Sequence, residues 1–272
     1  MRATKRGMAR RARHRGARFA AATAVAASLG AISLGTQAGF SPGAGAANPA
    51  IKSLADAHLG CSGVEGEGYW QVSASGGVFT NGAAVFYGSE GGATLNKPIV
   101  GIAPSVDGRG YWLVASDGGV FSFGDASFYG SEGGTKLNQP IVGLAATKDG
   151  RGYWLVAADG GVFSFGDAPF YGSLGAKTLN APIAAIAPAR NGNGYVLAAR
   201  DGGVFTFGAS GFYGSAAGQT TAPVTGVAGT FFGNGYTLTT SNGSVYNFGD
   251  SSFCGVSGNA STNSPIVGLA FY

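Results

Sequence analysis

Residues 110–131 read GYWLVASDGGVFSFGDASFYGS, and residues 152–173 repeat this stretch with only two substitutions. The leading Gly-Tyr pair occurs five times, starting at residues 68, 110, 152, 194 and 235, with spacings of 42, 42, 42 and 41 residues. A period of this length, rich in short apolar strands and glycine turns, is typical of β-propeller blades and not of helical arrays. The repeat therefore predicts an all-β fold.

Each repeat divides into four strand-like pieces, which in the second repeat cover residues 98–103, 111–115, 120–123 and 128–131. Asp117-Gly118 separates the second piece from the third. This pair favours a hairpin, because a two-residue type I′ turn needs positive φ at both positions. We therefore expect each repeat to form a four-stranded antiparallel blade.

The motif of the first piece, Pro-Ile-Val, appears once more at 265–267, while the first repeat has lost it. We expect a five-bladed β-propeller over residues 61–272, in which strand 265–272 pairs with the second strand of the first blade and closes the ring. Closure would remove the exposed sheet edges of an open stack. A linear solenoid is the alternative, although it gives no reason for an extra strand.

Stacked blades cover both faces of a middle strand, so the recurring aromatic residues are expected in the core. These residues are Tyr69, Trp70, Trp112, Trp154, Phe86, Phe128, Phe170, Phe212 and Phe253.

The first 46 residues have the three parts of a secretory signal peptide. Eight basic residues lie within 1–18, a mildly apolar stretch covers 19–40, and small residues offer cleavage after Ala38 or Ala46. We expect residues 1–46 to be removed, 47–60 to act as a linker, and the mature chain to be extracellular or cell-wall associated, without a membrane span. An uncleaved anchor is the alternative, but polar residues and glycines interrupt the apolar stretch.

The mature chain is weakly acidic, although the whole sequence has a net charge of +4. All 13 carboxylates lie beyond residue 55, and nine basic residues lie beyond residue 18, which gives a net charge of −4. No basic stripe recurs along the repeats, so nucleic acid is not an expected partner. We expect a monomer.

Cys61 and Cys254 are the only cysteines. An even number in an exported chain predicts a disulfide. Cys61 precedes the first blade and Cys254 belongs to the fifth repeat, so a bond between them would join the two ends of a closed ring. Two free buried thiols are the alternative.

The residues needed for common catalytic and metal sites are scarce. His14 lies in the expected signal peptide, so His58 is the single histidine of the expected mature chain. We therefore do not expect a Ser-His-Asp relay, a Cys-His pair or a His/Cys metal cluster. Most carboxylates recur at symmetric turn positions, where they can bond the local backbone. We therefore expect a protein that is not an enzyme and that has no cofactor and no metal. A glycan-acting hydrolase and calcium binding remain alternatives.

The units at 110–131 and 152–173 resemble a tandem repeat of exported actinobacterial proteins, and the likeness extends over residues 68–272. The resemblance implies propeller-like blades and a surface-binding or matrix-binding role, and it brings no catalytic residues with it. The first, fourth and fifth repeats depart from the pattern, for example at Ser75, Val196 and Thr237. The count of five is similar in architecture to the tachylectin-like sugar-binding propellers.

The preferred hypothesis is a secreted, non-catalytic, lectin-like protein that binds a glycan or another cell-envelope polymer at several sites. The loops between the second and third strands share one face of a propeller with the loops that lead into each blade. The candidate ligand-binding residues on that face are Asp117, Asp159, Asp201, Asn96, Asn138 and Asn180. Plain turn chemistry is the alternative explanation for the Leu-Asn-x-Pro loops. A protein-interaction or adhesion scaffold that binds an envelope protein is the rival function, and a purely structural surface protein is a third.

Overall fold

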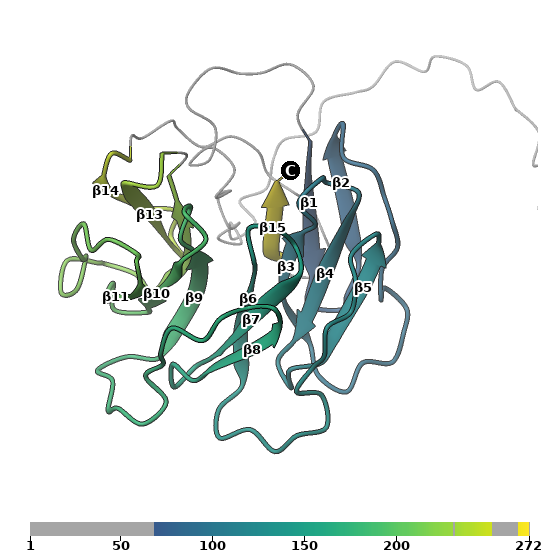
Figure 1. Ribbon diagram of the computed structural model, residues 1–272, viewed down its shortest axis with the longest axis horizontal. Helices are drawn as coiled ribbons and strands as arrows, with labels where there is room; N and C mark the ends of the chain where they lie inside the picture. The colour runs from purple at the N-terminus through teal and green to yellow at the C-terminus, as the bar shows by residue number, and fades with distance from the viewer. Residues whose placement is uncertain (1–67, 231, 252–265, 272) are drawn as a thin grey trace, which may run out of the picture. The chain divides into compact units, whose positions relative to one another are not determined.

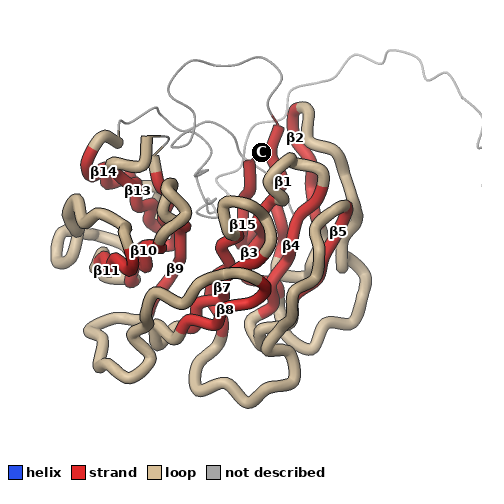
Figure 2. Tube along the Cα trace, in the orientation of Figure 1, coloured by secondary structure: helices blue, strands red, loops and turns tan. Residues whose placement is uncertain are grey.

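The computed structural model describes residues 68–230, 232–251 and 266–271. The chain divides into two compact units, 1–45 and 46–272, and every described residue belongs to the second. Fifteen strands and no helix occur in these described ranges. Figure 2 shows the strands joined by loops and turns. The structure therefore confirms the predicted all-β repeat fold.

The strands form five antiparallel sheets of three strands each, which we number from the first to the fifth in chain order. The first sheet has the order β15 (Ile266–Phe271), β1 (Gly68–Ser73), β2 (Val78–Gly82). The second contains β3 (Ile99–Pro104), β4 (Gly110–Ala115) and β5 (Val120–Gly124). The third contains β6 (Ile141–Ala146), β7 (Gly152–Ala157) and β8 (Val162–Gly166). The fourth contains β9 (Ile183–Pro188), β10 (Gly194–Ala199) and β11 (Val204–Gly208). The fifth contains β12 (Val224–Gly229), β13 (Gly235–Thr240) and β14 (Val245–Gly249).

The C-terminal strand pairs with the first repeat, as expected. β15 lies antiparallel to β1, with Ala270 opposite Trp70, and Figure 1 shows the two strands side by side. Neighbouring sheets contact one another through their first strands, in the order β15, β3, β6, β9 and β12. No comparable contact joins β12 to β15 in the described residues.

The prediction of four strands per repeat is wrong, because the fourth piece bonds to a side chain of the next repeat and not to a strand. Tyr129 N–H donates to the hydroxyl of Tyr153 at 3.2 Å, and that hydroxyl donates to the Gly130 carbonyl at 2.6 Å. Gly130 has a φ of 133°, which an L-residue rarely adopts. The segment therefore crosses from one sheet to the next without forming a ladder.

The middle strand of each sheet from the second to the fifth is buried along its whole length. Successive side chains point to opposite faces, so Tyr153 contacts the ring of Trp112 from the preceding sheet while Trp154 contacts that of Tyr195 from the following one. Each buried tryptophan also donates its indole N–H to a carbonyl 15 residues further along, as Trp154 does to Pro169 at 2.8 Å. The aromatic side chains thus tie neighbouring repeats together.

The expectation that all recurring aromatic residues lie in the core is wrong for one set. Trp70, Trp112 and Trp154 are buried, but Phe86, Phe128, Phe170 and Phe212 are 55, 59, 61 and 61% exposed. They occupy the crossing segment. The tyrosine that follows each of them instead packs its ring against the buried tyrosine of the next repeat, although Tyr213 remains 37% exposed. Tyr69 is half-buried.

We expect alkaline unfolding of this protein to depend on one buried tyrosine in each of four repeats. Burial raises the pKa of Tyr111, Tyr153, Tyr195 and Tyr236 above the usual 10.0, and hydrogen bonds from backbone amides offset part of the rise. The unfolded chain then loses these protons at lower pH than the folded chain, so stability is fully present below pH 10 and falls as the pH rises above it. Denaturant titrations at increasing pH, followed by tyrosinate absorbance, should show this fall. Stability that is unchanged well above pH 10 would contradict the expectation.

Three predictions fall outside the described residues. The signal peptide at 1–46, the linker at 47–60 and the bond between Cys61 and Cys254 all involve parts of the chain that the structure does not describe, as does Phe253. They stay predictions. Within the described ranges, no helix is long and apolar enough to cross a membrane.

Candidate functional site

In each sheet from the second to the fifth, the turn between the second and third strands lies against the loop that enters the first strand. In the fourth sheet, Arg200 N–H donates to the Pro182 carbonyl at 2.9 Å. The same bond joins Ser116 to Pro98, Ala158 to Pro140 and Ser241 to Pro223. This bond brings each candidate aspartate near the candidate asparagine of its own sheet.

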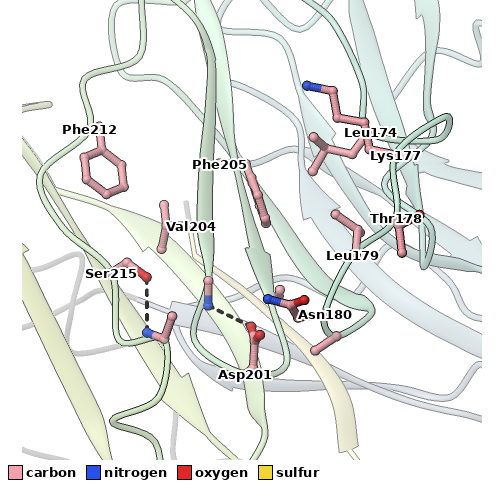
Figure 3. Close-up of a pocket in the computed structure, with 14 residues that line it drawn as sticks. Leu174, Lys177, Thr178, Leu179, Asn180, Asp201, Val204, Phe205, Phe212 and Ser215 are labelled. Atoms are coloured by element: carbon pink, nitrogen blue, oxygen red, sulfur yellow. Dashed lines mark hydrogen bonds between the residues drawn. The ribbon is translucent and has the colours of Figure 1, made fainter.

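A cavity of about 440 Å³ lies at this junction in the fourth sheet (Figure 3). Its walls come from the loop 174–181, the turn between β10 and β11, and the segment 212–217 that follows β11. Asn180 and Asp201 lie close together on one side of it in Figure 3, and Phe205 and Phe212 line it as well. The structure therefore brings two of the six predicted residues into one cavity with two aromatic rings.

The candidate aspartates also form the turns, as the alternative explanation predicts. Asp201 Oδ1 accepts a hydrogen bond from Gly203 N–H at 2.9 Å, and Asp117 and Asp159 bond Gly119 and Gly161 in the same way. Oδ2 of Asp201 has no hydrogen-bond partner among the described residues. The turn thus fixes the carboxylate in one orientation and leaves one oxygen available to a ligand.

The same residue types occupy the same register in the second and third sheets, but the fifth sheet differs. Asn96 and Asp117 belong to the second sheet, and Asn138 and Asp159 to the third. In the fifth sheet the corresponding residues are Thr221 and Asn242, and Asn242 Nδ2 donates directly to Thr221 Oγ1 at 3.4 Å. These two groups satisfy each other, so we assign equivalent sites only to the second, third and fourth sheets.

The exposed phenylalanines are candidate binding residues that the sequence analysis missed. Phe128, Phe170 and Phe212 follow the second, third and fourth sheets, and Phe212 lines the cavity of its own sheet. A signal was present in the Phe-Tyr pair, because neighbouring side chains in an extended segment point to opposite sides. Since the tyrosine packs inward, the phenylalanine must face solvent. The cavity of the fourth sheet therefore combines an asparagine, an aspartate and an exposed phenylalanine, which we call a triad. We infer equivalent triads for the second and third sheets from their matching residues.

The three triad sites differ in their polarity. Leu174 lines the cavity of the fourth sheet, whereas the matching residue is Glu90 for the second sheet and Glu132 for the third. The fourth site thus has the most apolar wall, and the other two have an additional carboxylate nearby.

A second group of carboxylates lies in the loops between the first and second strands. A hydrogen bond from the Thr147 hydroxyl and another from Arg151 N–H lower the pKa of Asp149. Burial and the nearby charge of Asp149 raise the pKa of Asp167. Asp149 is held by its own loop and also interacts with Asp167, which follows β8. In the described residues, no three His, Cys, Asp or Glu side chains are grouped closely enough to hold a metal ion.

No protein-family model matches the chain, and no curated protein matches it at a significant level. The geometry of the triad sites is therefore the basis of the functional proposal.

Proposed function

We propose that this chain is a secreted, non-catalytic binding protein that attaches to carbohydrate of a cell wall or extracellular matrix through its three triad sites. One observation carries the proposal: the same three residue types recur at the same register in three successive sheets, beside a cavity in the sheet where Phe212 lies. A repeated site suits a ligand that is itself a repeating polymer.

The chemistry of the triad suits a sugar. An exposed aromatic ring offers a flat apolar surface to the C–H face of a pyranose, and covering the ring removes apolar area from water. The asparagine amide can both donate and accept hydrogen bonds, whereas the aspartate only accepts them. Sugar hydroxyls need both kinds of partner, with apolar contact beside them.

The proposal includes a five-bladed ring. The pairing of β15 with β1 supports it, because the last strand of the chain completes the sheet of the first repeat. A disulfide between Cys61 and Cys254 would join the same two regions, and a signal peptide at 1–46 would deliver the chain to the oxidising environment in which such a bond forms. The resemblance to the tandem repeat of exported actinobacterial proteins agrees with this location.

Retention of the purified chain on insoluble polymers tests the proposal. We expect the chain to co-sediment with at least one wall or matrix polysaccharide, in a saturable manner that free oligosaccharide reverses. Failure to bind any such polymer, together with capture of a defined envelope protein, would instead support the protein-interaction scaffold. Turnover of a glycan during the same incubation would support the hydrolase.

A further inference from the structure

A larger cavity, of about 530 Å³, lies between the first strands of the second to fifth sheets. β3, β6, β9 and β12 each contribute consecutive residues to its wall. The apolar part of the wall is made of Ile102, Leu144, Ile186 and Val227, with alanines and prolines between them. This cavity is distinct from the triad site of the fourth sheet, with which it shares no lining residue.

The hydroxyl groups in this wall already have carboxylate partners, in the same loop for Ser105 and Thr147 and after the third strand of the sheet for Thr230. Ser105 Oγ donates to Asp107 at 3.1 Å, Thr147 Oγ1 to Asp149 at 2.8 Å, and Thr230 Oγ1 to Asp250 at 2.5 Å. All three residues are buried. Since these protons are committed, the wall presents a mostly apolar surface to anything inside the cavity.

Two cationic side chains stand at one end of the cavity. Lys148 and Arg190 occupy the same register in successive repeats, are exposed, and line the cavity. Each lies against a glycine of the next loop: a Cβ added at Gly192 would come within 3.4 Å of Lys148 Cβ, and one at Gly233 within 2.8 Å of Arg190 Cβ. Tyr171 donates its hydroxyl to the Gly192 carbonyl at 3.2 Å, which fixes the loop beside Lys148.

The nearby carboxylates do not line this cavity. Asp107 and Asp149 instead line an adjoining cavity with Trp112, which shares Ser105 and Val106 with the first, and they form ion pairs with Arg109 and Arg151 at 3.7 and 3.9 Å. Lys148 and Arg190 thus line the end of the apolar cavity, whereas the acidic groups of the neighbouring loops lie beside it, where their own loops and arginines hold them.

We propose that the cavity between the first strands binds a linear amphiphile with one anionic head group, whose acyl chain lies along the apolar wall and whose carboxylate lies between Lys148 and Arg190. The volume falls within the range of small-molecule sites, and an apolar cavity with few polar groups at one end orients such a ligand. This binding goes beyond the proposed attachment to glycans and does not depend on it.

Equilibrium dialysis of the full chain with radiolabelled dodecanoate tests the proposal. We expect saturable binding of one dodecanoate per chain, and much weaker binding of dodecanol, which has the same chain length without the charge. Lys148→Gln and Arg190→Gln should each weaken dodecanoate binding by about threefold to tenfold, because each removes one opposite charge near the head group. Lys136→Gln makes the same charge change at an exposed position outside the cavity, and should leave the affinity unchanged.

A blocking variant tests the cavity itself. Gly229 lines it without a positive φ, and a Cβ added there would meet only the Pro188 carbonyl oxygen, at 3.7 Å. Gly229→Phe should therefore reduce dodecanoate binding by tenfold or more while retention on glycans persists. If that variant fails to fold, Lys148→Glu on the exposed rim should produce a comparable loss without touching the core.

Several outcomes would overturn the assignment. They are no saturable binding of dodecanoate, equal affinity for dodecanol, three or more ligands per chain, or full binding by both Gly229→Phe and Lys148→Glu. Three ligands per chain would place the acyl chain at the triad sites. Loss of glycan retention with dodecanoate binding intact would count against the proposed function alone.

Discussion

Replacing Trp154 by alanine is expected to lower the free energy of unfolding by about 3–5 kcal/mol, the usual cost of truncating a large core aromatic residue. Trp154 is completely buried, and its ring lies 5.5 Å from that of Tyr195 in the next sheet. The substitution would leave a cavity between the third and fourth sheets and would leave the Pro169 carbonyl without its indole donor. Urea denaturation of the wild type and the variant measures the loss in unfolding free energy, provided that both free energies depend on urea concentration with the same slope.

Phe170→Ala is the matched control, because it removes an aromatic ring only 16 residues away that is 61% exposed. Its effect on the free energy of unfolding should stay within about 0.5 kcal/mol. A loss below 1 kcal/mol for Trp154→Ala, or equal losses for the two variants, would show that the distinction between core and exposed aromatic residues is wrong.

Simultaneous replacement of Phe128, Phe170 and Phe212 by alanine is expected to weaken attachment to a polymeric glycan by 100-fold or more. Each ring is a large exposed apolar surface, and a single replacement should weaken attachment only about threefold to tenfold. Sites on one chain that bind one polymer reinforce each other, so their losses multiply when all three are changed. The polymer concentration at which half of the protein sediments, compared between wild type and variant, gives the ratio of their affinities.

The exposed Val106 provides the control for this loss, since Val106→Ala also removes exposed apolar surface but at a loop away from the triads. It should retain wild-type attachment. A triple variant that still attaches normally would remove the triads from the proposed function, whereas loss of attachment in the Val106 variant would point to a different surface.

The strands could be predicted closely because their signals are local. The piece expected at 111–115 is β4 at Gly110–Ala115, and the piece expected at 120–123 is β5 at Val120–Gly124. Both are short apolar runs bounded by glycine turns. Gly118 has a positive φ but Asp117 does not, so the prediction of a type I′ turn at this pair is wrong, although the hairpin itself forms. The pairing of the final strand with the first repeat was also predictable, because the Pro-Ile-Val motif missing from the first repeat reappears at the end of the chain.

The sequence could not show whether the fourth piece of each repeat forms a strand, because this depends on a contact with the next repeat. The Phe-Tyr-Gly-Ser segment has strand-forming residues, yet the hydroxyl of Tyr153 takes the hydrogen bonds that a ladder would have used. The exposure of Phe128 follows from the same contact. The segment alone indicates that Phe128 and Tyr129 face opposite sides, but not that Tyr129 is the one that contacts the next repeat.

The sequence predicted the asparagines and aspartates of the candidate site, but not its phenylalanines. Strand order alone places Asn180 near Asp201, and the structure puts both in one cavity. We assign no site to the fifth sheet because Asn242 and Thr221 form a hydrogen bond with each other, and only the structure shows this bond. Lys148 and Arg190 lie 42 residues apart in the sequence. That both line the end of one cavity follows from the packing of the sheets and could not be predicted from the sequence.

Hydrogen–deuterium exchange of the full chain, with and without the polysaccharide that retains it, tests the central claim most directly. The account predicts slower exchange in the loops 90–97, 132–139 and 174–181 and in the turns that contain Asp117, Asp159 and Asp201. Exchange in the loops 105–109 and 147–151 should not change. Protection confined to those latter loops, or to a single repeat, would contradict the claim that three equivalent sites hold one polymer.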